Sequence, residues 1–301
     1  MELIDTIRVG NTLGEGVQWD AAAQALWWTD ILEKRLHRYN WATKTLETFP
    51  APERIGSFGL IEGSHLLVVA FASGIALWDP QGTTLRWLAR PDAGTTGVRF
   101  NDGRVDRQGR FWAGTMEETE PRTGRGSLYC IDGNGRAARR ESGVKIANGL
   151  CWSPDSTRLY FADSPSGEIH CYDFNAAIGT IANRRLFAKI TDGAHPDGAA
   201  TDSQGFVWSA HWGAGRVVRY TPDGAIDAVL EVPARQPTCV AFGGPALDLL
   251  FVTSARDGLT EIERAAQPSA GDVFVYKIGY AGLPESRFIL DAGIRRDVER
   301  S

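Results

Sequence analysis

Leu26-Trp27-Trp28-Thr29 is a short apolar stretch with five related copies further along the chain of 301 residues. The other copies are Leu67-Val68-Val69-Ala70, Arg110-Phe111-Trp112-Ala113, Leu159-Tyr160-Phe161-Ala162, Phe206-Val207-Trp208-Ser209 and Leu250-Phe251-Val252-Thr253. Their third residues, at positions 28, 69, 112, 161, 208 and 252, are separated by 41, 43, 49, 47 and 44 positions. A fixed period of roughly 20 to 50 residues is the signature of repeat architectures such as propellers. The chain is therefore predicted to contain six copies of one structural unit.

The residues around each stretch indicate that the unit is made of β-strands. A turn precedes each copy, as at Ser153-Pro154-Asp155, and most copies are followed by a second run that alternates polar and apolar residues, as at Glu168-Ile169-His170-Cys171-Tyr172. We expect an all-β fold, a six-bladed β-propeller with four antiparallel strands per blade, in which residues 1–301 form one domain. The segment Leu3 to Val9 is expected to pair with the last blade, and Leu259 to Ala266 to form a short helix or helical turn.

Composition and charge exclude several classes of protein. The net charge is −5 and the basic residues form no stripe, which argues against a nucleic-acid partner. The N-terminal residues lack the features of a signal peptide, and Leu66 to Trp78 is too short to span a membrane. We therefore expect a cytoplasmic protein without a membrane partner, either a monomer or a weak homo-oligomer. Buried, reduced thiols are expected for the four cysteines, which form no CxxC pair: Cys130, Cys151, Cys171 and Cys239.

A polar residue lies 11 to 14 positions before the third residue of each repeated stretch. These residues are Glu15, Ser57, Asn101, Asn148, Asp197 and Thr238. Residues that share one phase of a propeller lie at one height around its axis, so two carboxylates and two amides are predicted to face each other. Oxygen ligands of this kind suit a hard cation such as Ca²⁺, Mg²⁺ or Mn²⁺. Asn-Gly and Asp-Gly are also common turn dipeptides, which is the alternative for any one of them taken alone.

Several motifs, in this order, resemble those of the gluconolactonase, senescence marker protein-30 (regucalcin) and luciferin-regenerating enzyme family. They cover nearly the whole chain and are Leu13-Gly14-Glu15-Gly16, Arg99-Phe100-Asn101-Asp102-Gly103, Gly109 to Met116, Asn148-Gly149-Leu150, Pro196-Asp197-Gly198 and Thr253 to Gly258. The resemblance implies a six-bladed propeller with one divalent metal ion on its axis, either Ca²⁺ or Zn²⁺, Mn²⁺ or Mg²⁺. It places the metal ligands on Glu15, Asn148 and Asp197.

The resemblance also places substrate-binding roles on Arg99 and Asn101, with one departure nearby. Members of the family carry an extra residue between Gly-Thr-Met and an acidic pair, whereas here Glu117 and Glu118 follow Met116 directly. We assign the acid that contacts the sugar to Glu118. The alternative is that residues 117–125 are a solvated acidic loop.

The expected activity is the hydrolysis of a sugar-acid lactone, such as a glucono-, galactono-, xylono- or arabinono-lactone, by a metal-dependent carboxylic ester hydrolase. Asp197 is the candidate catalytic base, which would bind the ion and accept a proton from the attacking water. His195 and His211 are weaker candidates for contact with substrate.

Two other functions are compatible with the sequence. One is a broader esterase or organophosphate hydrolase that uses the same ion. The other is a non-catalytic propeller that binds calcium or another ligand. A binding propeller does not require two carboxylates and two amides at one phase together with Arg99, so the axial ring favours the enzyme.

Overall fold

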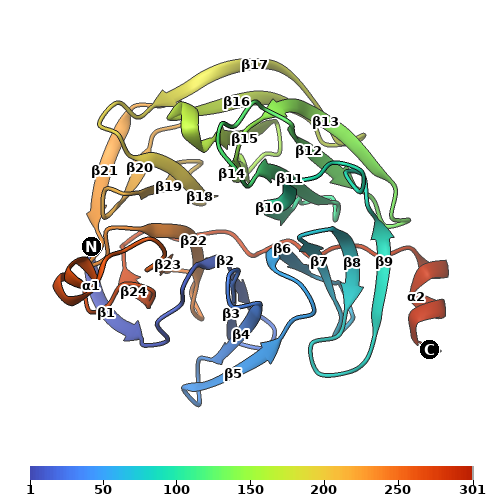
Figure 1. The fold of residues 1–301 in the computed structure, drawn as a ribbon, viewed down its shortest axis with the longest axis horizontal. Helices are drawn as coiled ribbons and strands as arrows, with labels where there is room; N and C mark the ends of the chain where they lie inside the picture. Colours follow the sequence, from blue (N-terminus) through green and yellow to red (C-terminus); the bar gives the residue numbers. More distant parts are fainter. Residues whose placement is uncertain (300–301) are drawn as a thin grey trace.

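The computed structural model describes residues 1–299, which form a six-bladed β-propeller. Figure 1 shows six four-stranded sheets arranged around a central axis. In chain order the first five sheets, which we call blades 1 to 5, are β2–β5, β6–β9, β10–β13, β14–β17 and β18–β21, and blade 6 is β22, β23, β24 and β1. The predicted fold is therefore confirmed.

The innermost strand of each blade lies beside the axis, and the other three follow outward as antiparallel neighbours. The inner strands are β2 (Gly14–Asp20), β6 (Ile55–Leu60), β10 (Val98–Val105), β14 (Ala147–Trp152), β18 (His195–Thr201) and β22 (Pro237–Gly243). The second strands are β3 (Ala25–Asp30), β7 (Leu67–Phe71), β11 (Phe111–Glu117), β15 (Arg158–Asp163), β19 (Val207–Trp212) and β23 (Leu249–Ser254). These second strands contain the six repeated stretches.

The third and fourth strands form the outer part of each blade. The third strands are β4 (Arg35–Asn40), β8 (Gly74–Trp78), β12 (Gly126–Ile131), β16 (Glu168–Asn175), β20 (Arg216–Tyr220) and β24 (Val273–Lys277). The fourth strands are β5 (Thr45–Pro50), β9 (Leu85–Ala89), β13 (Ala137–Val144), β17 (Thr180–Lys189), β21 (Ile226–Glu231) and β1 (Glu2–Ile7). The β1 strand pairs with β24 from Glu2–Lys277 to Ile7–Val273, so the N-terminal segment closes the ring as predicted.

Large aromatic side chains fill the space between neighbouring blades. Trp208 on β19 is fully buried and packs edge-on against Phe242 of blade 6 and against Tyr280. Its indole Nε1 donates a hydrogen bond of 3.0 Å to Oδ2 of Asp202, whose Oδ1 accepts two backbone N–H groups of the turn before β19. This turn and the buried tryptophan therefore fix each other, and each blade packs against the next.

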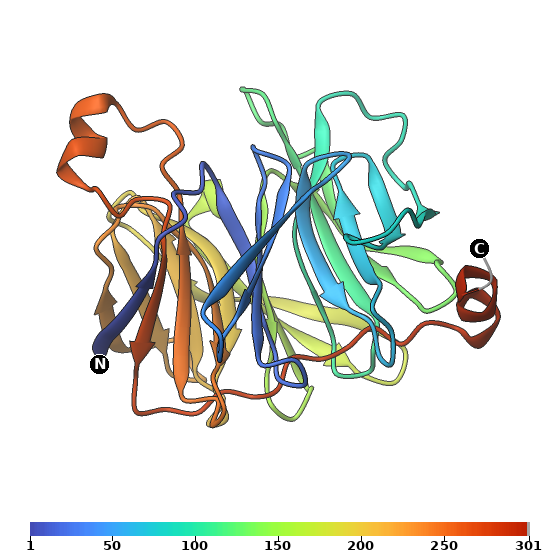
Figure 2. The ribbon, with the colours of Figure 1, turned by 90° about the horizontal axis from the view of Figure 1, so that it is seen from below.

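A segment that follows β24, residues 278–291, runs across one face of the propeller, and we call it the strap. Figures 1 and 2 show it leaving blade 6, passing under the centre of the ring and reaching the far side, where α2 (Ala292–Glu299) begins. Its backbone bonds to turns of several blades, with Ala281 O accepting from Ser203 N at 2.9 Å and Phe288 N donating to Leu60 O at 2.7 Å. Neither the strap nor α2 was predicted from the sequence.

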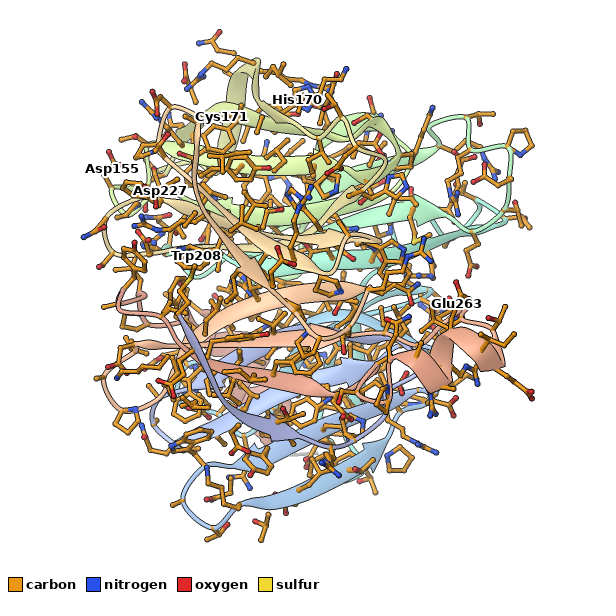
Figure 3. The ribbon with its side chains drawn as sticks, turned by 90° about the vertical axis from the view of Figure 1, so that its left-hand side faces the viewer. Asp155, His170, Cys171, Trp208, Asp227 and Glu263 are labelled. Atoms are coloured by element: carbon orange, nitrogen blue, oxygen red, sulfur yellow. The ribbon has the colours of Figure 1, made fainter. Side chains whose placement is uncertain are left out.

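The opposite face carries the loops that join second to third strands. One of them holds α1 (Glu261–Ala266), which confirms the predicted short helix, and its N-terminus has a capping box formed by Thr260 and Glu263. Figure 3 shows Glu263 at one edge of the propeller and Asp155, in the turn between β14 and β15, at the other. The face that carries α1 is called the upper face below, and the face that carries the strap the lower face.

Two simpler expectations can also be compared with the fold. All four cysteines are buried and unbridged, as predicted. Among residues 1–299, no helix has the length and apolar character needed to cross a membrane.

Candidate functional site

The six ring residues lie on the six inner strands, and each inner strand is bulged where its ring residue lies. The pairing of inner and second strand shifts register there in every blade. In β14 the shift falls between Asn148 and Cys151, and in β18 between Pro196 and Ala199, on either side of Asp197. A bulge bends the strand and re-aims the side chain it carries. The Asn-Gly and Asp-Gly dipeptides are thus bulges within strands, and the turn alternative is wrong.

Glycine is required beside two of these bulged positions. Gly149 has a φ of 64°, in the left-handed region that side chains other than glycine rarely adopt. At Gly198 the constraint is space, because a Cβ atom would lie 2.6 Å from Sγ and 2.8 Å from Cα of Cys239 on β22. The inner strands of blades 5 and 6 therefore approach each other closely next to Asp197.

Two carboxyl groups meet at the axis. Glu15 comes from blade 1 and Asp197 from blade 5, and both are more than nine-tenths buried. Burial raises the pKa of both groups, and the neighbouring carboxyl groups, among them Asp102, raise them further. Within the described residues, Oδ1 of Asp197 is buried without a hydrogen-bond partner. Two neighbouring buried acids are costly as anions unless a cation compensates their charge.

The amide of Asn148 joins these acids from blade 4, held in place by its neighbours. Its Nδ2 donates to Ser164 Oγ at 2.8 Å, and that hydroxyl donates to Pro196 O at 2.7 Å. On the other side, Asn101 Nδ2 donates to Asn148 Oδ1 at 3.2 Å and to Ala147 O at 3.0 Å. Nδ2 of Asn148 is engaged by Ser164. Its Oδ1 accepts one bond from Asn101 and has a second lone pair, which can bind a cation.

These three side chains fit a divalent metal ion. Glu15, Asn148 and Asp197 offer only oxygen ligands, the set that Ca²⁺, Mg²⁺ and Mn²⁺ prefer, and the unpartnered Oδ1 of Asp197 is the atom in need of such a ligand. The described residues contain no group of three or more His, Cys, Asp and Glu side chains placed to hold a metal. The candidate set differs from such a group because its third member is an amide.

Arg99 links the axial residues to the upper rim of the channel. It is 7% exposed, and its Nη1 donates to Asn101 Oδ1 and to Phe100 O, both at 2.8 Å. Its Nε lies 3.6 Å from Oε1 of Glu118. Burial and then the nearby Arg54 lower the pKa of the Arg99 guanidinium to about 10. The group remains a cation at neutral pH.

Glu118 is half-buried and faces two arginines. Its Oε1 lies 2.6 Å from Nη1 of Arg54, which directly precedes β6, and 3.6 Å from Arg99. Its backbone N donates to Gly97 O at 3.0 Å, which holds it against the start of β10. The structure therefore places Glu118 beside Arg99 despite the shortened acidic segment.

Glu117 has a different environment from its neighbour. It is 1% exposed, and its carboxylate accepts hydrogen bonds from the backbone N–H groups of Thr123, Gly124 and Arg125 and from the Arg125 side chain. The Arg125 guanidinium, with these backbone groups, lowers the pKa of Glu117 to about 2. Glu117 thus organises the loop at 118–125, so the alternative of a merely solvated acidic loop does not describe it.

The two histidines considered from the sequence lie in different places. His195 is exposed, and its Nδ1 lies 3.0 Å from Ser164 O, next to the ligand candidates. His211 is buried, with its ring nitrogens contacted by Tyr220 Oη at 3.1 Å and by Arg216 Nε at 3.3 Å. Burial lowers the pKa of His211 to about 4. Side chains of the third strand β20 thus contact both ring nitrogens of His211, and we assign this residue no contact with substrate.

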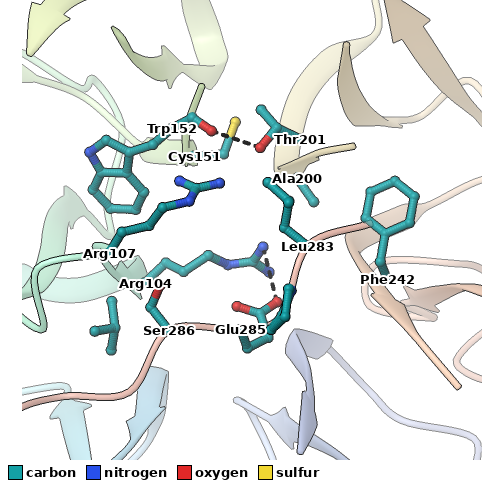
Figure 4. Close-up of a pocket in the computed structure, with 12 residues that line it drawn as sticks. Arg104, Arg107, Cys151, Trp152, Ala200, Thr201, Phe242, Leu283, Glu285 and Ser286 are labelled. Carbon is teal, nitrogen blue, oxygen red and sulfur yellow. Dashed lines mark hydrogen bonds and ion pairs between the residues drawn. The ribbon is translucent and has the colours of Figure 1, made fainter. Parts of the chain in front are cut away.

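The channel is sealed from below. Arg104 on β10 reaches across the axis, where its Nη2 donates to Val17 O and Val240 O, both at 3.2 Å. Its Nη1 lies 3.4 Å from Oε1 of Glu285 on the strap. Figure 4 shows this pair beside a cavity of about 40 Å³ that also contacts Arg107. The candidate site is therefore approached from the upper face.

Comparison with known proteins agrees with the fold and motifs described above. The model of the family described as "SMP-30/Gluconolactonase/LRE-like region" matches residues 13–256. This chain belongs to that family. It is 40% identical to 6-deoxy-6-sulfogluconolactonase of Pseudomonas putida, with 94% of this chain and 97% of the relative covered. It is 38% identical to L-arabinolactonase of Azospirillum brasilense, with 92% of each covered. Among solved structures, the calcium-binding protein regucalcin of Agrobacterium tumefaciens superposes with a TM-score of 0.91 at 32% identity, covering 96% of this chain and 98% of its own.

The sequence motifs indicated membership of the SMP-30/gluconolactonase family, which the comparison confirms. The six predicted site residues fall into one connected cluster. Sequence reasoning missed three residues around them: Arg54, Ser164 and Asp102. Arg54 and Ser164 lie outside the repeat phase, so no spacing argument reaches them. Asp102 lies next to Asn101 and could have been noticed, because a bulge directs consecutive residues to one side.

Proposed function

We propose that this protein is a sugar lactonase that depends on a divalent cation, opening the ring ester of an aldonolactone to the free aldonic acid. The observation that carries the proposal is the buried, unpartnered Oδ1 of Asp197 among two further oxygen ligands on the axis, beside Arg99 and Asn101. A buried carboxylate oxygen without a partner is costly unless a cation or a reacting group satisfies it.

In this proposal Glu15, Asn148 and Asp197 hold the cation. When bound, the ion acts as a Lewis acid on the lactone carbonyl and lowers the pKa of a bound water. Asp197 is the catalytic base: one of its oxygens accepts the proton of the water that attacks the carbonyl carbon. The bond between the carbonyl carbon and the ring oxygen then breaks, and the proton passes to that oxygen as the ring opens.

The remaining predicted residues orient the sugar. Arg99 donates hydrogen bonds to the substrate, and Asn101 accepts one from a sugar hydroxyl through its Oδ1. Their mutual bond of 2.8 Å holds both in place before substrate arrives. Glu118 accepts hydrogen bonds from sugar hydroxyls, with its carboxylate held by the two arginines. Fixed donors and acceptors of this kind lower the entropic cost of reaching the attack geometry.

The relatives support the reaction and leave the sugar open. One is named for a 6-deoxy-6-sulfogluconolactone and another for L-arabinolactone, at similar identity to this chain. Glucono-, galactono-, xylono- and arabinono-lactones are therefore the substrates to test.

The test is acid release from these lactones by metal-stripped protein, measured in a pH-stat before and after Ca²⁺, Zn²⁺, Mn²⁺ or Mg²⁺ is added back. Asp197→Asn should lower kcat by roughly 100- to 10,000-fold, the usual contribution of a general base. Asp173→Asn is the matched control, because Asp173 is an exposed acid paired with Arg185 on the outer strands. Wild-type turnover by Asp197→Asn would refute the assignment.

A second candidate is a calcium-binding propeller without catalysis. The observation in its favour is the similarity to a solved structure described as a calcium-binding protein. Calcium binding by calorimetry, without acceleration of any of the four lactones by any of the four ions, would establish this alternative in place of the lactonase.

A further inference from the structure

Arginine side chains are clustered at the upper rim of the channel. Three arginines gather beside the candidate site, and we call Arg54, Arg99 and Arg122 the arginine rim. Arg99 is close enough to both others for each to lower its pKa. They come from three segments: the residue before β6, the start of β10 and the loop after β11. The fold therefore brings together like charges that are far apart in sequence.

One half-buried carboxylate, that of Glu118, pairs with two of these three cations. Glu118 Oε1 lies 2.6 Å from Arg54 and 3.6 Å from Arg99, and within residues 1–299 it is the acid paired with Arg54. Arg122 pairs with Glu120, whose side chain is 69% exposed and therefore well screened by water. Glu117 is fully engaged by Arg125. The rim thus carries a positive charge that no protected carboxylate balances.

The axial acids balance it only in part. Glu15 is close enough to Arg99 to raise its pKa, but in the proposed function Glu15 and Asp197 neutralise the divalent cation. Arg99 lies between the axial residues and the rim, because its Nη1 donates to Asn101 while its Nε faces Glu118. A lactone whose carbonyl lies at the axial acids would therefore point its far end at the arginine rim.

We propose that the arginine rim recognises an acidic substituent, a sulfonate, carboxylate or phosphate, at the end of the sugar lactone remote from its carbonyl. The inference rests on the proposed lactonase activity and specifies its substrate class. A guanidinium carries five N–H donors in a planar fork that matches such oxyanions, and Arg54 has Glu118 as its acidic partner, which leaves donors for a ligand. Arg54 and Arg122 are the specificity-determining residues in this assignment.

The experiment compares lactones that differ in charge. Glucono-1,5-lactone is the neutral probe, the same lactone with a sulfonate at C6 is the matched anion, and glucaro-1,4-lactone is a carboxylate-bearing anion. Wild-type protein should have a kcat/KM at least 10-fold higher for the sulfonated than for the neutral lactone. Arg122→Gln should remove most of that preference through KM, with less than 3-fold change for the neutral lactone. Arg54→Gln also frees Glu118 and should lower kcat/KM for both lactones, but by more for the sulfonated one. Arg185→Gln, on an exposed outer-strand pair, is the matched control.

The dependence of KM on ionic strength provides a second test of the arginine rim. Salt screens exposed and half-buried charges, so KM for the sulfonated lactone should rise between 0.05 and about 0.5 M NaCl while KM for the neutral lactone stays constant. Equal kcat/KM for neutral and acidic lactones, or an equal loss on both in Arg54→Gln, would overturn the inference and leave the lactonase intact. Hydrolysis of none of the probes with any divalent ion would instead defeat the proposed function.

Discussion

At the scale of single residues, neighbours in sequence have separate tasks. Glu117 is the last residue of β11 and Glu118 follows it directly, yet their side chains have different partners. Glu117 accepts three backbone N–H groups and holds its loop, whereas Glu118 faces Arg54 and Arg99. The sequence shows two equivalent glutamates, and only the packing distinguishes them.

A buried histidine gives the fold a dependence on pH. His37 is 3% exposed, stacks on Trp28 and lies 2.9 Å from Thr48 Oγ1, and burial lowers its pKa to about 4 from an ordinary value near 6.5. As pH falls below about 6.5 the unfolded chain takes up this proton before the folded one, so stability is lost between about pH 6.5 and 4.

We therefore expect His37→Gln to weaken the acid sensitivity of folding. The free energy of unfolding should fall between pH 7 and 5 by about 2 kcal/mol less in His37→Gln than in wild type. Urea titrations at both pH values measure the difference, and a constant offset caused by the substitution cancels in it. His65→Gln, at an exposed position, is the control; an unchanged pH dependence in His37→Gln would contradict this account.

At the scale of elements, the inner strands show how closely site and fold are linked. A bulge in every blade directs a ring residue to the axis, and the residue after it is often glycine, because the next inner strand is close. The same local distortion therefore allows dense packing around the axis and presents the ligands.

Gly198 provides a test of this packing. Gly198→Ala should lower the free energy of unfolding by about 1 to 3 kcal/mol, the usual cost of overpacking, because the new Cβ would meet Cys239 at 2.6 to 2.8 Å. Chemical denaturation measures the loss. Gly94→Ala is the control, since nothing lies within 4 Å of a Cβ there. Equal stability of the two variants would show that the inner strands can move apart.

The sequence predicted the elements unevenly, for physical reasons. Second strands, buried on both faces, appear as apolar runs, and most third strands appear as alternating patterns. Fourth strands are exposed at the rim, as the pattern of β5 and β21 shows, so no hydrophobic signal marks them. The ring residues could be found because a sixfold repeat fixes their phase, whereas Arg54 lies outside that phase and could not.

At the scale of the whole molecule, the strap is the part that the repeat could not indicate. It is irregular, it follows the last unit, and it is held by backbone bonds to turns of blades far apart in sequence. Its acid Glu285 reaches Arg104, the cation that seals the lower end of the channel. Closure by β1 was predicted because an incomplete last blade needs an outer strand, but nothing in the repeat requires a strap.

Glu285→Gln should lower the free energy of unfolding by about 3 kcal/mol, because Arg104 then keeps a buried charge without its acid partner on the strap. Both side chains are little exposed, at 11% for Arg104 and 12% for Glu285. Guanidinium denaturation measures the change. Asp173→Asn breaks an exposed pair and should leave stability close to that of wild type. If the two variants behave alike, the channel pair contributes no more than a surface pair.

The pairing of β1 with β24 has a consequence for how the protein is made. Glu2 lies opposite Lys277 in this pairing, and the two are far apart in the sequence. The β1 strand therefore leaves the ribosome long before its partner strand is synthesised. At about 5 to 20 residues per second, translation leaves β1 waiting for tens of seconds. During that interval blades 1 to 5 can form in turn, each from its own contiguous residues. The first of the described strands to be synthesised thus pairs with the last, and until β24 is made the blades form an open arc.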